Sequence, residues 1–131
     1  MPKITGVGGI FFKAEDQDDT VAWFSKNLGM EMQGSFSMFP WRERETPEKK
    51  GYTVFNVHKA TTDYYGPSKQ PFMLNFRVDD LDAMLKELEA KGVTIVKRFD
   101  PEPNGKFAHI AGPNDITIEL WEPADPDPYD P

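Results

Sequence analysis

Two side chains that can accept and release protons, His109 and Glu119, lie close together near the end of the chain. They belong to residues 105–123, GKFAHIAGPNDITIELWEP, in which two alternating runs flank the turn-forming stretch GPND. Because side chains alternate across a strand, this pattern predicts an antiparallel hairpin with aliphatic side chains such as Leu120 on one face. The other face then carries His109 and Glu119, which are suited to acid–base work or to metal binding.

A second group of candidate site residues comes from other predicted strands and from the end of the hairpin. The alternation places six of them on the same face as the hairpin pair, as candidate ligand-binding residues: Asn56, His58, Met73, Asn75, Arg77 and Trp121. Arg77 is suited to clamp a carboxylate or phosphate of a ligand, or else it pairs with Glu119 in a salt bridge. Trp121 is suited to stack on a flat ligand near the rim of a pocket.

The sequence leaves the roles of Glu119 and the two histidines open. Glu119 and His109 are the candidate catalytic groups, but Glu119 can equally be a structural carboxylate that Arg77 or a backbone amide satisfies. Each histidine is a hydrogen-bonded residue of a pocket wall, an exposed residue near a strand end, or a metal ligand. If His58, His109 and Glu119 converge, they supply a metal site of two histidines and one carboxylate.

The scaffold that positions these side chains divides into two similar halves. Each half contains a strand, an acidic helix cap, an amphipathic helix, a glycine and further strands, and Gly29 and Gly92 end the two helices. We expect residues 1–66 and 67–123 to form two tandem β-α-β-β-β modules of one domain, followed by an acidic, proline-rich tail at 124–131. Together they predict an α+β fold: a curved, mostly antiparallel eight-stranded sheet with helices outside and a pocket on its concave face.

In the first half, the sequence predicts one strand, one loop and one buried helical face. Residues 30–39 are predicted as a strand, and residues 40–51 as a polar loop. Val21, Phe24 and Leu28 fall on one helical face, which predicts that all three face the core.

Bulk composition excludes several classes of protein. The chain has 131 residues, 38% of them hydrophobic and 13% aromatic, which suffices for a real core. The absence of cysteine excludes disulfides, zinc–thiolate sites and cysteine nucleophiles. The net charge of −7 argues against nucleic acid as a partner, because phosphate binding needs a basic surface. With no apolar run of membrane-spanning length and no signal-peptide pattern, we expect a cytoplasmic protein without a membrane partner.

Three stretches resemble one known family. AWFSKNLGM resembles the helix end of its first module, FRVDDLDAMLKELEAKGV the strand and helix that open its second, and GKFAHIAGPNDITIELWEP its ending. Over about residues 4–123, the chain therefore resembles the vicinal oxygen chelate superfamily of glyoxalase I, bleomycin resistance proteins, fosfomycin resistance enzymes and extradiol dioxygenases. The resemblance implies the glyoxalase/bleomycin resistance/dioxygenase fold, a homodimer and a small-molecule ligand.

The resemblance also implies where a metal would bind. In metal-using members the ligands are histidine or glutamate at inward-facing strand positions, which fall here at about Gly9, Asn56, Met73 and Glu119. Glycine offers no donor, and a methionine thioether suits soft ions. We therefore expect no metal cofactor and a conventional metal site that is largely lost. The alternative is a divalent Zn, Ni, Mn or Fe ion held by Glu119, His109 and His58.

The expected function is that of a glyoxalase/bleomycin resistance-like protein that binds a small organic molecule in the concave pocket, with Glu119 as the polar anchor. The alternative is a metal-dependent lyase, isomerase or dioxygenase of the same superfamily that uses a relocated site around Glu119. The sequence decides neither whether the protein is an enzyme nor which molecule it binds.

Overall fold

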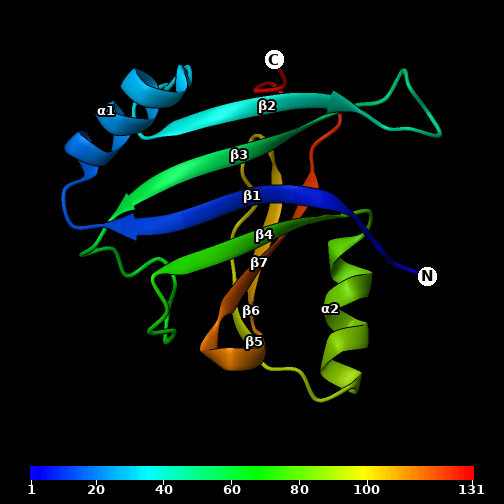
Figure 1. Cartoon of the computed structure of the whole chain (residues 1–131). Coiled ribbons are helices and arrows are strands. Elements are labelled where there is room, and N and C mark those ends of the chain that lie inside the picture. Colours follow the sequence, from blue (N-terminus) through cyan, green and yellow to red (C-terminus); the bar gives the residue numbers. More distant parts are fainter.

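Seven strands form one continuous sheet in the order β2-β3-β1-β4-β7-β6-β5, seen in a computed structural model of residues 1–131 (Figure 1). In chain order the elements are β1 (Ile4–Ala14), α1 (Gln17–Leu28), β2 (Phe36–Arg42), β3 (Lys50–Lys59), β4 (Phe72–Val78), α2 (Leu81–Ala90), β5 (Ile95–Arg98), β6 (Gly105–Ala111), the 3₁₀ turn η1 (Pro113–Asp115) and β7 (Thr117–Pro123). The strands alternate apolar and polar residues, so each has one face for a core and one for a site.

The order of the strands reflects the sequence repeat. β1 pairs in parallel with β3, β4 pairs in parallel with β7, and β1 and β4 meet antiparallel at the centre. Outward from that centre each half continues with an antiparallel neighbour, β2 on one side and β6 on the other. The predicted α+β fold with a mostly antiparallel sheet is therefore confirmed.

The prediction of eight strands is wrong, because the first half lacks one. Residues 30–39 were expected to form a strand, but β2 begins only at Phe36 and runs on to Arg42, into the expected loop. Gly34 adopts a left-handed backbone with φ of +67° and turns the chain back, so that Gln33 forms only an isolated bridge to Phe36. The segment before this turn is too short to extend the sheet beyond β2.

The second helix covers one face of the β4–β7–β6 half. The Asp80 carboxylate accepts a hydrogen bond from the Ala83 amide at the helix start, as the sequence predicts for an acidic cap. Leu81 and Leu85 are buried against sheet residues that include Ala108 and Leu120. This cluster is the larger of the two apolar cores, and it fixes which face of the sheet is left for other side chains.

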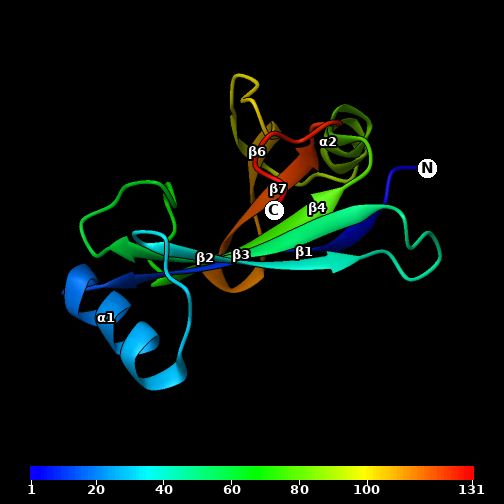
Figure 2. The ribbon, with the colours of Figure 1, turned by 90° about the horizontal axis from the view of Figure 1, so that it is seen from above.

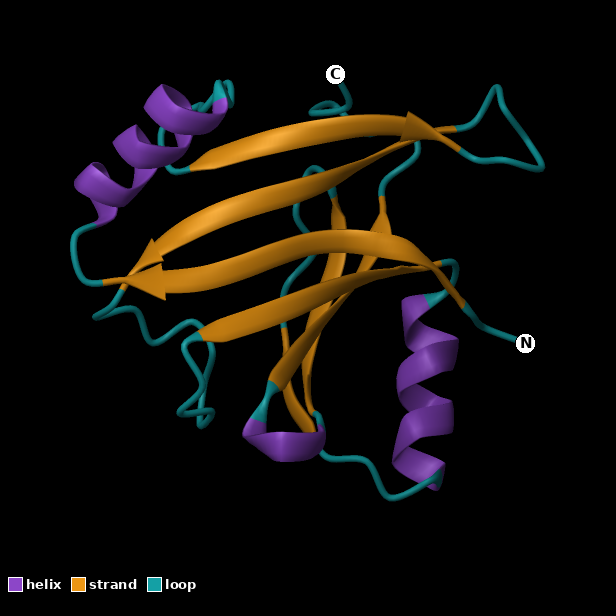
Figure 3. Ribbon diagram, in the orientation of Figure 1, coloured by secondary structure: helices purple, strands orange, loops and turns teal.

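The first helix packs more loosely. Phe24 lies edge-on to Phe12 and Phe55, with ring centroids 6.1 and 4.9 Å away, so this residue faces the sheet as predicted. Leu28 is 60% exposed, however, and its predicted place in the core is wrong. Trp23 lies beside Phe24 but is also half exposed. α1 lies at one end of the sheet, where it packs on β1 and β3 (Figure 3), and none of its residues is fully buried.

The sheet is strongly twisted, and its concave face is left to loops. Seen from above, α1 and α2 lie outside the two halves of the sheet, while the segment after β3 and the C-terminal tail lie on the inner side (Figure 2). Neither helix has the length and apolar character that a transmembrane helix requires.

Replacing Leu85 by alanine tests this packing. Leu85 is 4% exposed, so the change should lower the free energy of unfolding by about 2–5 kcal/mol, as a cavity in a well-packed core does. Urea denaturation followed by circular dichroism measures it. Leu28→Ala on the exposed end of α1 is the matched control and should cost less than about 1 kcal/mol. Equal losses in the two variants would show that the face of α2 is misassigned.

Candidate functional site

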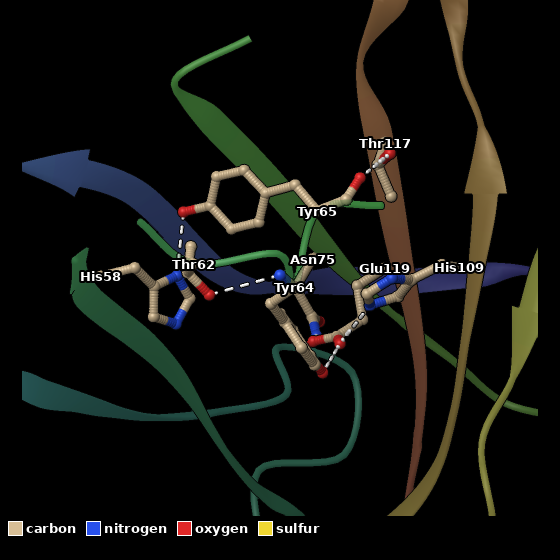
Figure 4. A network of polar contacts seen from close by, with 8 residues as sticks. All are labelled: His58, Thr62, Tyr64, Tyr65, Asn75, His109, Thr117 and Glu119. Carbon is tan, nitrogen blue, oxygen red and sulfur yellow. Dashed lines mark hydrogen bonds and ion pairs between the residues drawn. The ribbon is translucent and has the colours of Figure 1, made fainter. Parts of the chain in front are cut away.

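Three neighbouring strands bring three polar side chains together on the concave face. Asn75 of β4 lies directly beside Glu119 of β7, and Glu119 lies directly opposite His109 of β6. Residues paired across a ladder point to the same side of the sheet, so the pleat aligns all three (Figure 4). The hairpin and its two faces are therefore as the alternation of residues predicts.

Glu119 is a buried carboxylate with three hydrogen-bond donors. It is 3% exposed, and the Asn75 side-chain amide donates to its Oε1 at 2.6 Å. Its Oε2 lies 2.8 Å from His109 Nε2 and also accepts a hydrogen bond from the Tyr64 hydroxyl. An ionised carboxylate only accepts hydrogen bonds, so in this arrangement Nε2 is the protonated nitrogen of His109. The donors offset the cost of burying the carboxylate.

Tyr64 comes from the segment between β3 and β4, residues 60–71. Its ring stands edge-on to His109, with the centroids 4.8 Å apart, and closes the concave face over Glu119. Burial raises the pKa of Tyr64, and the nearby Glu119 carboxylate raises it further. Two hydrogen bonds hold this segment to η1 and β7. The Thr117 hydroxyl donates to the Tyr65 carbonyl at 2.6 Å, and the Ser68 hydroxyl donates to the Asp115 carbonyl at 2.6 Å.

His58 is held apart from this cluster. Its Nδ1 lies 2.9 Å from the Tyr65 hydroxyl, and the Tyr64 ring lies between the two histidines, 5.9 Å from His58. Burial lowers the pKa of His58; the Glu119 carboxylate opposes this shift, and Lys13 reinforces it. The structure thus brings His109 and Glu119 together but does not bring His58 to them (Figure 4).

The remaining predicted site residues lie elsewhere on the same face. Asn56 accepts a hydrogen bond from the Ser35 hydroxyl at 2.9 Å, and Met73 is buried in a small apolar cluster with Phe11. Arg77 does not pair with Glu119, because its guanidinium points toward Tyr52 at the other end of the concave face.

Trp121 also differs from its predicted position. It was expected near the rim, but it is 2% exposed. Its ring stacks on Phe107 with the centroids 5.7 Å apart, and its Nε1 donates to the Asn104 carbonyl. Trp121 lies between the Glu119 cluster and the Arg77 end of the concave face, because it follows Glu119 by two residues on the same face of β7.

The glycine pair of β1 makes room for this arrangement. A side chain on Gly8 would overlap the Asn75 carboxamide and the Trp121 ring, and one on Gly9 would overlap the Phe11 ring. Asn75 Oδ1, which lies against Gly8, is buried without a hydrogen-bond partner. The first strand therefore contributes close backbone approach to the site and no functional side chain.

Comparison with protein-family models gives a match over most of the chain. Residues 8–120 match the Glyoxalase/Bleomycin resistance protein/Dioxygenase superfamily. The chain belongs to this superfamily. No functionally curated protein matches the chain in a sequence comparison.

Solved structures of superfamily members share the fold at low sequence identity. Methylmalonyl-CoA epimerase from Streptomyces coelicolor, in complex with 2-nitronate-propionyl-CoA, matches with a TM-score of 0.68 and 16% identity over 93% of this chain and 99% of that one. The epimerase from Mycobacterium tuberculosis has a TM-score of 0.55 and 23% identity over 92% and 89% of the two chains. The Mn(II)-bound glyoxalase from Novosphingobium aromaticivorans has a TM-score of 0.62 and 14% identity over 93% of this chain and 40% of that one.

The residues of this chain do not fit the divalent metal that the superfamily often binds. A protein site for such an ion needs several donors that converge on one point. No group of three or more histidine, aspartate or glutamate side chains does so here. Both Glu119 oxygens already accept hydrogen bonds, and the free oxygen of Asn75 points toward Gly8. The expectation that the protein uses no metal stays a prediction.

The residues that close the site were not predicted from the sequence. Tyr64 and Tyr65 lie in TTDYYGPSKQP, whose glycine, proline and polar residues are typical of a linker. Two adjacent tyrosines in a polar segment were the available signal, because large aromatic side chains tend to be buried when a surface offers them a place. Phe99, whose ring centroid lies 4.6 Å from that of His109, was missed in the same way.

Tyr64→Phe should reduce the loss of stability at alkaline pH. The pKa of Tyr64 is higher in the folded protein than in the unfolded chain, where it is about 10. The unfolded chain therefore loses this proton first, and the stability that the neutral phenol contributes is lost as the pH rises above about 10. Urea denaturation between pH 9 and 11.5 should show a shallower decline for Tyr64→Phe than for the wild type. Tyr129→Phe, at a tyrosine that is 54% exposed, should leave the slope unchanged. An unaltered slope in Tyr64→Phe would contradict the assigned contact.

Proposed function

We propose that the protein binds a small organic molecule on the concave face of its sheet, with Glu119 as the polar anchor. The observation that carries this proposal is the Tyr64 hydroxyl on Glu119. Two donors of Glu119, Asn75 and His109, are fixed on buried strands, whereas Tyr64 belongs to a loop and is 37% exposed. A ligand hydroxyl or N–H group that replaces the tyrosine hydroxyl keeps the buried carboxylate satisfied.

The surroundings of Glu119 favour a ligand with a flat or apolar body. With the Tyr64 side chain displaced, the walls nearest to Glu119 are His109, Phe99 and His58, all of them rings that Tyr64 contacts in the closed state. Rings of this kind stack on planar groups, while the single carboxylate fixes the orientation of the ligand. On this proposal the strand residues around Glu119 stay in place, and the loop that carries Tyr64 moves when a ligand binds.

A catalytic alternative rests on the His109–Glu119 pair. A buried carboxylate 2.8 Å from an imidazole nitrogen can hold a histidine in one tautomer and orient it for proton transfer. This arrangement favours a lyase or isomerase that moves a proton, and it does so with residues already in place. The metal-dependent lyase, isomerase or dioxygenase expected as an alternative would also require His58 to leave Tyr65 and join Glu119.

Opposite effects of two substitutions test the binding proposal. Fragment-sized organic molecules are titrated into the protein, and binding is followed by protein-observed NMR. Ligands that perturb the amides of β6 and β7 should bind about tenfold or more weakly to Glu119→Gln, since a hydrogen bond to a charged group is lost. The same ligands should bind more tightly to Tyr64→Phe, which removes the competing hydroxyl but keeps the ring.

Glu31→Gln, at an exposed glutamate, is the matched control and should leave these affinities unchanged. Ligands that bind Glu119→Gln and the wild type equally would contradict the role of Glu119. Elemental analysis of protein purified without chelators distinguishes the alternative: about one divalent metal per chain, lost in Glu119→Gln, would favour the metal-dependent enzyme.

We further propose that two copies of the chain associate as a homodimer. The outer face of β1 between the helices is apolar and uncovered: Ile10 is 48% exposed and Val7 43%, although they pair with Leu74 and Phe76 on the face that α2 covers. An open sheet with such a face is a surface that a second copy can bury. The cytoplasmic location expected from the sequence also stays a prediction.

Light scattering tests this association. The wild type should have the mass of two chains at micromolar concentration, and Ile10→Lys should shift it toward the monomer, because a charge would be buried in an apolar contact. Ile4→Lys places the same charge at the exposed start of β1, and its effect on the mass should be smaller than that of Ile10→Lys. A wild-type mass equal to one chain at all concentrations would exclude a stable dimer.

A further inference from the structure

Arg77 is a buried cation with almost no polar partner. It is 8% exposed, and its guanidinium lies among three aromatic rings, 4.6 Å from the Trp121 centroid, 5.2 Å from Trp41 and 5.6 Å from Tyr52. Its only hydrogen bond is a long one, 3.4 Å from Nη1 to the Tyr52 carbonyl. None of the ion pairs of the protein includes it.

This environment leaves most of the donors of Arg77 unused. A guanidinium has five N–H donors and stays charged at neutral pH even where burial lowers its pKa, as it does here. The aromatic rings satisfy the flat faces of the cation through cation–π contacts, but they offer nothing to its N–H edge. A planar acceptor, such as a carboxylate, matches that edge with two parallel hydrogen bonds.

A cavity of about 710 Å³ lies at this end of the concave face, and Arg77, Trp41 and Tyr52 line it. Tail residues 124–127 and 130 also line it, and the tail lies on the inner side of the sheet (Figure 2). Its volume is that of a small-molecule site. The Glu119 cluster, by contrast, is covered by Tyr64, and none of its residues lines this cavity.

Two carboxylates of the tail that line the cavity lie near Arg77. The Tyr52 hydroxyl donates to Asp127 Oδ2 at 2.7 Å, and Asp130 Oδ1 is buried without any hydrogen-bond partner. Both carboxylates are close enough to oppose the effect of burial on the pKa of Arg77, yet neither forms an ion pair with it. The tail therefore brings negative charge to the cation but leaves the guanidinium edge unfilled.

We propose that the Arg77 cavity binds a small organic carboxylate, and that Asp127 and Asp130 of the tail, which line the cavity, compete with that ligand for Arg77. The proposal goes beyond the binding of a ligand at Glu119 and does not depend on it. A monoanion is favoured over a phosphate because acidic side chains outnumber basic ones in the cavity wall. Besides the tail and Arg77, the charged lining residues are Glu43, Glu48, Asp79 and Glu122 against Lys49 and Lys50. The aromatic walls favour a carboxylate on an apolar, flat body.

Benzoate is a suitable probe, with benzamide as the neutral isostere and phenyl phosphate as the dianion. Titrations of the full chain are followed by tryptophan fluorescence, since Trp41 and Trp121 contact Arg77, and by calorimetry. Benzoate should bind saturably and at least tenfold more tightly than either benzamide or phenyl phosphate. Asp127→Asn should tighten benzoate binding at least fivefold, because it removes the competing carboxylate. Arg77→Gln should weaken it at least tenfold.

Matched controls separate this site from general charge effects and from the Glu119 cluster. Asp100→Asn removes one exposed carboxylate elsewhere and should leave benzoate affinity unchanged. Glu119→Gln should also leave the benzoate affinity unchanged. Failure of the Arg77 proposal can therefore be told apart from failure of the Glu119 proposal. If Arg77→Gln does not fold by circular dichroism, Arg77→Lys takes its place and should weaken binding because lysine lacks the planar fork.

Three results would overturn the proposal. The first is an absence of saturable benzoate binding in both the wild type and Asp127→Asn. The second is equal affinity for benzoate and benzamide, and the third is equal tightening in Asp127→Asn and Asp100→Asn. Tighter binding of phenyl phosphate than of benzoate would overturn the assignment to carboxylates.

Discussion

The burial of the Glu119 carboxylate is the constraint on which the concave face depends. A carboxylate that is 3% exposed must be hydrogen-bonded or lose its charge. Here three donors come from three separate parts of the chain: Asn75 on β4, His109 on β6 and Tyr64 on the loop between β3 and β4. Each of these segments must be in place before the carboxylate is satisfied, so this one side chain links the centre of the sheet, its outer hairpin and the loop that covers them.

The pleat of the sheet and the lack of a side chain at Gly8 of β1 make the cluster of Asn75, Glu119 and His109 possible. Asn75, Glu119 and His109 are adjacent because three strands pair in register, which needs no special turn or strain. The space beside them exists because Gly8 carries no side chain. A side chain there would overlap the Asn75 carboxamide, so the first strand provides room for the cluster.

The concave face has two ends with opposite electrostatic character. At one end an anion is buried among donors and covered by Tyr64; at the other end a cation is buried among aromatic rings and covered by the acidic tail. In both places a side chain from a loop or terminus provides what a ligand would provide, a hydroxyl on Glu119 and carboxylates near Arg77. The Glu119 end is closed in this way, whereas the Arg77 end keeps an open cavity and most guanidinium donors have no protein partner.

The sequence by itself determined the last hairpin and which of its residues share a face, so that His109 and Glu119 lie on the same side of the sheet. These follow from local physics, since alternation, helix caps and turn residues act over a few neighbouring positions. It did not determine the contacts of Tyr64 with Glu119, of His58 with Tyr65, or of the tail with Tyr52. Those join residues that are far apart in the chain or that lie in segments without a periodic pattern. Only the twist of the assembled sheet decides which of them meet, because it sets where a loop of given length can reach. The same reason explains the missing eighth strand: Gly34 was visible in the sequence, but only the left-handed turn at that glycine ended the segment before β2.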